Sequence, residues 1–93
     1  MTQWSNEERS RVWDKGHDIS EISPSLYKMD DFGRIMKYSE HGNYESRYGW
    51  HVDHITPKIL GGSDHISNLR PLHFFSNTSL GGSLSGISKA MKR

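Results

Sequence analysis

Residues 50–77 read WHVDHITPKILGGSDHISNLRPLHFFSN, and this stretch decides how the second half of the chain folds. Aromatic and branched residues over 48–55 predict a β-strand, which Pro57 ends. Gly61 and Gly62 predict a loop, because glycine tolerates positive φ. Residues 66–73 predict a further short extended segment, interrupted by Pro71, and a helix start that presents Asn77 follows. We therefore expect two strands joined by a long loop and followed by a helix.

The polar residues of this stretch suggest one kind of chemistry. Asp53 offers a carboxylate and Asn77 an amide oxygen, and both are hard ligands suited to Mg²⁺ or Mn²⁺. His54 is the nearby side chain whose ordinary pKa suits a general base near neutral pH. Asn68 could orient the His54 ring or hold the loop closed. Together these residues predict hydrolysis of a phosphodiester with one metal ion and one histidine base.

The same residues resemble the HNH endonuclease family. The matching features are Asp53-His54, Pro57, the Gly-Gly loop, Asn68-Leu69, and an Asn nine residues after Asn68. The resemblance covers about residues 32–80, and this segment is similar to small bacterial and phage members of the family. It implies an α+β fold with a ββα-metal core and a nuclease that acts on DNA.

In residue terms, the resemblance implies that His54 activates water, Asp53 and Asn77 hold Mg²⁺ or Mn²⁺, and Asn68 is part of the catalytic set. Because the chain has no cysteine, the four-cysteine zinc site of many relatives must be absent, and we expect no structural zinc. One metal ion and one base cut one strand, so we expect nicking, and a double-strand break would need a homodimer, a larger assembly or two successive cuts.

Three features leave alternatives open. Adjacent residues on a regular strand point to opposite faces, so Asp53 and His54 can share a site only where the strand twists or ends. His51 and His73 are possible further ligands for a metal or substrate, and His51, His54 and His73 could instead hold a purely structural zinc. Residues 78–82 carry no charge, which leaves phosphate contacts to Arg70, Lys58, Lys89, Lys92 and Arg93. A DNA-binding accessory module that cleaves poorly is therefore the main alternative.

Composition limits the class of protein further. The 93 residues carry a net charge of +1 and no cysteine, which excludes a disulfide framework and thiolate chemistry. Residues 1–40 hold six basic and eight acidic side chains, whereas residues 41–93 hold six and three. A phosphate-bearing partner would thus favour the second half, although weakly. The N-terminus lacks the apolar run of a signal peptide and no stretch resembles a membrane span, so we expect a cytoplasmic protein without membrane partners.

The remaining segments predict an arm and a C-terminal helix. Ser5, Glu8 and Gly16 predict a capped helix over 6–15, with Val12 and Trp13 as its core residues. Residues 19–31 read as a loop, and 32–38 as a strand. Apolar residues at helical spacing over 80–91 predict a weak terminal helix. We expect residues 1–31 to pack as an arm on an HNH domain of residues 32–93, in one structural unit.

Overall fold

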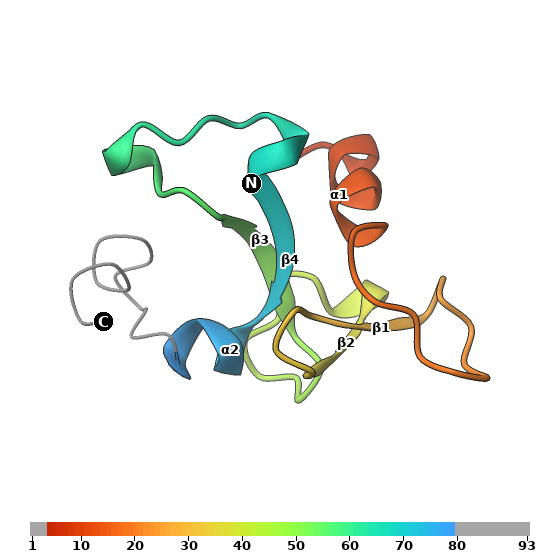
Figure 1. Ribbon diagram of the computed structural model, residues 1–93. Helices are drawn as coiled ribbons and strands as arrows, with labels where there is room; N and C mark the ends of the chain where they lie inside the picture. The colour runs from red at the N-terminus through yellow and green to blue at the C-terminus, as the bar shows by residue number, and fades with distance from the viewer. Residues whose placement is uncertain (1–3, 80–93) are drawn as a thin grey trace.

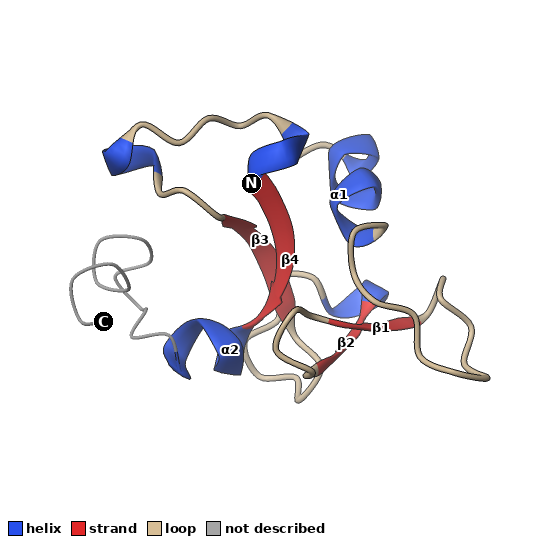
Figure 2. Cartoon of the chain, in the orientation of Figure 1, coloured by secondary structure: helices blue, strands red, loops and turns tan. Residues whose placement is uncertain are grey.

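The computed structural model describes residues 4–79, which form a small α+β fold. Two antiparallel β-hairpins make up its sheets, and one α-helix lies at each end of the described chain (Figure 1, Figure 2). Helix α1 spans Asn6–Trp13, β1 spans Tyr27–Met29 and β2 spans Ile35–Lys37. Strand β3 spans Trp50–His54, β4 spans Leu69–His73 and α2 spans Phe74–Ser79. The predicted helix over 80–91 lies outside the described residues.

The β3–β4 hairpin is the centre of the molecule (Figure 1). Its register pairs Trp50 with His73, Asp53 with Arg70, and His54 with Leu69. Both predicted strands form but are shorter than expected: β3 begins at Trp50, and β4 begins only at Leu69, after a 3-10 turn at Ile66–Asn68. Because strand side chains alternate, the register divides the hairpin into two faces. Trp50, Val52, His54, Leu69, Pro71 and His73 share one face, and His51, Asp53, Arg70 and Leu72 share the other.

Helix α1 forms where its caps predict it. The Ser5 side chain accepts a hydrogen bond from the Glu8 backbone N–H, and the Glu8 side chain accepts one from Ser5 N–H. This capping box satisfies two of the N–H groups that a helix start leaves unpaired. The regular helix ends at Trp13, two residues before the predicted end, in turns closed by Lys15 N–H and Gly16 N–H.

The first hairpin corrects part of the sequence-based prediction. Residues 27–29, expected to lie in a loop, form β1, because their partners in β2 supply the hydrogen bonds that a three-residue strand needs. The expected strand over 32–38 is shorter, at Ile35–Lys37. The carboxylate of Asp30 accepts hydrogen bonds from the N–H groups of Phe32 and Arg34, so a turn replaces the first part of the expected strand. At the other end of that strand, Tyr38 begins a 3-10 turn.

The apolar core lies between α1 and one face of the β3–β4 hairpin. It contains Val12, Trp13, Met36, Trp50, Val52 and Leu69. The rings of Trp13 and Trp50 lie 5.0 Å apart, and the Trp50 indole N–H donates to Lys37 O at 2.9 Å. These contacts hold the first half of the chain against the second.

No helix within residues 4–79 is long and apolar enough to cross a bilayer.

Candidate functional site

His54, the last residue of β3, is held by a carboxylate from the following loop. Its Nε2 lies 2.7 Å from Asp64 Oδ1, and its side chain is 17% exposed. The hydrogen bond with His54, and next among the favourable effects the charge of Lys58, lowers the pKa of the Asp64 carboxyl below its usual value. On its other side the His54 ring contacts Trp4 at a centroid distance of 5.8 Å. A carboxylate accepts from an N–H, so this pairing assigns the proton to Nε2 and leaves Nδ1 as the acceptor.

Asn68 closes the long loop between β3 and β4. Its Oδ1 accepts a hydrogen bond from Thr56 N–H at 2.8 Å, and its Nδ2 donates to Thr56 O and Ser63 O at 3.0 and 2.8 Å. Of the two roles considered from the sequence, these contacts match holding the loop closed. The loop carries both Asp64 and Lys58, so Asn68 acts on His54 through the position of that loop.

The two glycines of this loop are needed for different reasons. Gly61 has φ of 95°, a conformation that favours glycine, as the sequence predicted. At Gly62, a Cβ atom would come within 1.7 Å of Thr56 O, so the backbone itself approaches too closely for any side chain. The amide of Gly62 also donates to Pro57 O at 2.9 Å. The Gly-Gly pair therefore permits the tight turn that returns Asp64 toward His54.

Asp53 lies on the opposite face of the hairpin from His54. Its side chain is 4% exposed, and its Oδ2 accepts a hydrogen bond from Arg70 Nε at 2.9 Å. Arg70 is the cross-strand partner of Asp53, so the two side chains leave the sheet together. Arg70, predicted to contact DNA phosphates, is thus already engaged by a buried carboxylate.

Helix α2 covers the same face as Asp53. The Phe74 ring stacks on His51 at 4.9 Å with an interplanar angle of 6°. Asn77 follows Phe74 by three residues and so lies on the same side of the helix. Within residues 4–79, the buried Oδ1 of Asn77 has no hydrogen-bond partner. A buried acceptor without a donor is costly unless something else binds it.

The other sequence-predicted residues are spread over the molecule. The buried ring of His73 receives a hydrogen bond from Phe75 N–H at Nδ1, and its Nε2 lies 2.6 Å from Arg47 O, so both nitrogens are engaged by backbone groups, one in α2 and one before β3. Lys58 is exposed, with its Nζ 3.5 Å from Asp64 Oδ1. Lys89, Lys92 and Arg93 lie outside the described residues.

The histidines do not gather into a metal site. Within residues 4–79, no three His, Asp or Glu side chains are grouped so that they could hold a metal ion. His51 lies on one face of the hairpin, and His54 and His73 lie on the other. The described residues therefore offer no three-histidine zinc site.

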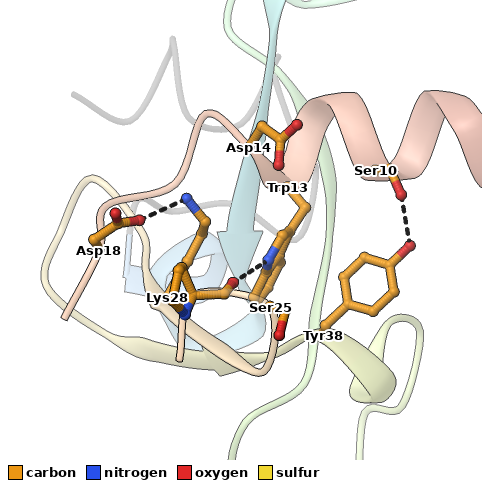
Figure 3. Close-up of a pocket in the computed structure, with 8 residues that line it drawn as sticks. Ser10, Trp13, Asp14, Asp18, Ser25, Lys28 and Tyr38 are labelled. Atoms are coloured by element: carbon orange, nitrogen blue, oxygen red, sulfur yellow. Dashed lines mark hydrogen bonds and ion pairs between the residues drawn. The ribbon is translucent and has the colours of Figure 1, made fainter. Parts of the chain in front are cut away.

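One cavity, of about 470 Å³, lies away from all these residues. Its lining includes Trp13, Lys28 and Tyr38, between α1 and the first hairpin (Figure 3). Lys28 donates to Asp18 Oδ1 at 2.8 Å, and the Ser10 and Tyr38 hydroxyls lie 3.0 Å apart. None of its lining residues belongs to the β3–β4 hairpin or to α2.

A family match from comparison with known proteins covers the β3–β4 hairpin and helix α2. The family model described as HNH endonuclease matches residues 38–80. Residues 38–80 match an HNH domain. This domain indicates a nuclease or DNA-binding function, and HNH nucleases generally use a divalent metal ion. No curated protein and no solved structure matches the chain significantly.

Two carboxylates at the site were not selected from the sequence. Asp64 follows the Gly-Gly pair of the HNH domain by two residues, and a loop that must return to His54 makes it a reasonable candidate. Asp31 lies outside the matched segment, and its Oδ2 is 3.7 Å from Arg70 Nη1. Nothing in the sequence relates Asp31 to Arg70, because only the packing of the first hairpin brings them together.

Proposed function

We propose that this protein is a divalent-metal-dependent DNA endonuclease that nicks one strand, with the ββα-metal core formed by β3, β4 and α2. The observation that carries the proposal is that His54, within the segment that matches the HNH family, lies at the end of β3 with its Nε2 held by Asp64 at 2.7 Å. A histidine oriented by a carboxylate in this way is a suitable general base.

His54 takes the proton from the attacking water in this proposal. Asp64 accepts a hydrogen bond from Nε2–H and so keeps the ring in the tautomer that presents Nδ1 as the base. The imidazolium that forms is stabilised by the same carboxylate. Asn68 is the positioning residue of the loop, because its hydrogen bonds to Thr56 and Ser63 fix the segment that carries Asp64.

The face of the hairpin that α2 covers suits a hard cation. Asp53 supplies a carboxylate and Asn77 a buried amide oxygen that lacks a hydrogen-bond partner in the described residues. Mg²⁺ commonly binds through one or two protein ligands and keeps its other positions for water and phosphate. When bound, a cation there supplies stabilisation of the charge that develops on the phosphate and the leaving oxygen.

Lys58 is the exposed cation of the site. It lies in the loop that follows His54 and is available to phosphates, with Arg70 on the other face. The described residues that face the site carry few basic groups, and the chain has a net charge of only +1. Affinity for DNA should therefore be low and should fall steeply as the salt concentration rises, unless a second copy or a larger assembly contributes.

A second candidate function is a DNA-binding module with little cleavage. The observation that favours it is the pairing register, by which Asp53 and His54 leave β3 on opposite faces. A metal on Asp53 and a base on His54 act on one phosphate only if the DNA reaches both around the end of β3.

Plasmid nicking separates these two functions. Supercoiled plasmid is incubated with the protein in Mg²⁺, in Mn²⁺ and in EDTA, beside His54→Ala, Asp64→Asn and the control His65→Ala. We expect open circles only with a cation, and a loss of about 10²- to 10⁴-fold in His54→Ala, since this is the usual contribution of a general base. Asp64→Asn should retain the fold and lose part of the rate.

The controls decide the interpretation. His65 is exposed and bonds locally to Ser67, so His65→Ala should nick like the parent protein. Asn77→Ala should require a higher cation concentration for half-maximal rate. If His54→Ala nicks as fast as the parent, the assignment of the base is wrong. Retarded plasmid on a gel with no open circles in either cation would favour the DNA-binding module.

A further inference from the structure

The carboxylate of Asp53 is balanced by a cation of the protein itself. Asp53 is almost fully buried, and the Arg70 guanidinium, 17% exposed, donates to it at 2.9 Å. A buried carboxylate is stable only when it is paired and hydrogen-bonded. Arg70 therefore meets the electrostatic need that a divalent ion would meet at the same oxygen atoms.

Arg70 also has a second set of partners besides Asp53. Its Nη1 lies 3.7 Å from Asp31 Oδ2, and its Cζ lies 5.3 Å from the centre of the Phe32 ring. The other oxygen of Asp31 lies 2.7 Å from His17 Nε2, which holds this carboxylate in place. Asp31 and Phe32, and the His17 that holds Asp31, all belong to the first half of the chain, outside the segment that matches the HNH family.

We propose that Arg70 is the resident counter-cation of Asp53, that a divalent ion displaces it, and that Asp31 and Phe32 keep the guanidinium beside the site after the displacement. A dication on Asp53 repels Arg70, whereas Asp31 offers it a carboxylate and Phe32 an aromatic face. Held by Asp31 and Phe32, the displaced guanidinium would still offer N–H donors to a phosphate. This inference rests on the proposed role of Asp53 as a metal ligand.

The first test measures Mn²⁺ binding without DNA, by calorimetric titration, together with thermal unfolding in EDTA and in Mn²⁺. Arg70→Gln removes the competing cation, so we expect its Kd for Mn²⁺ to fall by at least about fivefold. The melting temperature of Arg70→Gln in EDTA should be lower than that of the parent, because Asp53 loses its counter-cation. Adding Mn²⁺ should raise the melting temperature of the variant by more than it raises that of the parent.

A second variant tests the role of Asp31. Asp31→Asn removes the alternative partner of Arg70, so the displacement becomes harder and the Kd for Mn²⁺ should rise by at least about fivefold. A simple long-range effect of charge would give the same direction. The double variant distinguishes the two explanations, because Asp31 acts through Arg70 in our proposal and Asp31→Asn should then have no effect in the Arg70→Gln protein.

Two further variants serve as controls. Arg47→Gln removes the same charge at an exposed position and should leave the Kd for Mn²⁺ within about twofold of the parent value. Arg70→Lys keeps a cation beside Asp53, so its Kd should lie between those of the parent and Arg70→Gln. It also provides the comparison if Arg70→Gln does not fold.

The proposal is overturned if Arg70→Gln and Arg70→Lys bind Mn²⁺ like the parent, or if Asp31→Asn weakens binding equally with and without Arg70. Either result leaves the proposed nuclease function intact when the parent still nicks plasmid. A parent that binds Mn²⁺ with the expected Arg70 and Asp31 dependence and yet never nicks plasmid would support the displacement and reject the nuclease.

Discussion

The two faces of the β3–β4 hairpin carry different kinds of side chain, although they alternate along the same two strands. The face toward α1 carries Trp50, Val52 and Leu69, which complete the apolar core. The face toward α2 carries Asp53 paired with Arg70, and His51 stacked on Phe74. The first face thus contributes mainly apolar surface to the core, and the second combines the fully buried Leu72 with charged and polar groups.

This difference shows how a small chain supports a polar site. An apolar face can tolerate some repacking. Loss of one partner of a buried ion pair instead leaves an unpaired buried charge, which strongly destabilises the fold. The chain separates the two demands by strand alternation, so the same ten residues serve both. His54 and His73 are polar residues on the apolar side, and His54 lies at the end of the strand, where the loop brings Asp64 to it.

The largest expected effect is on the apolar face. Trp50 is fully buried and contacts the rings of Trp13, Tyr38 and His41. We expect Trp50→Ala to lower the free energy of unfolding by about 3–5 kcal/mol, because it leaves a large cavity. Since a small domain has about 5 kcal/mol to lose, most of the variant should be unfolded. Urea denaturation followed by circular dichroism measures this.

The matched control is on the outside of α2. Phe75 is 65% exposed, so Phe75→Ala should change the free energy of unfolding by less than about 0.5 kcal/mol. Equal losses in the two variants would contradict the assignment of the core to the α1 face.

An intermediate effect is expected in the loop that joins the two strands. Gly62→Ala places a Cβ against Thr56 O, so the loop must shift, at a cost of about 1–3 kcal/mol. The shift should also move Asp64. The rate of nicking should therefore fall even below the melting temperature, where the variant is still folded. Gly61→Ala tests only the positive φ and should cost about 1 kcal/mol. Identical nicking rates in Gly62→Ala and the parent would show that the loop does not position His54.

The smallest expected effect concerns pH. Burial, and then the charges of Arg9 and His51, lowers the pKa of His41 to about 4. Unfolded His41 titrates near 6.5, so between these values the unfolded state binds more protons and stability falls as the pH falls. His41→Phe retains a ring against Trp50 and removes this titration. The urea midpoint of His41→Phe should therefore fall less than that of the parent between pH 7 and pH 4.5. The explanation is contradicted if the midpoints of the variant and the parent fall by the same amount.

Local signals in the sequence predicted the parts of the fold that depend on neighbours in the chain. Ser5 and Glu8 predicted the start of α1, because a capping box acts over three residues. The resemblance of residues 50–77 to the HNH endonuclease family predicted a member of that family, and the family match over residues 38–80 confirms this. The β1 strand was missed, because three residues with weak strand preference become a strand only when β2 lies beside them.

The sequence by itself determined which residue types the site contains, since hard oxygens and a histidine at fixed spacing are a property of the chain. Only the tertiary structure decided how they are held. Asp64 reaches His54 across a folded loop, and Asp31 reaches Arg70 from another hairpin. The register of β3 and β4 puts Asp53 and His54 on opposite faces. These relations depend on packing between distant segments, and no local pattern in the chain records them.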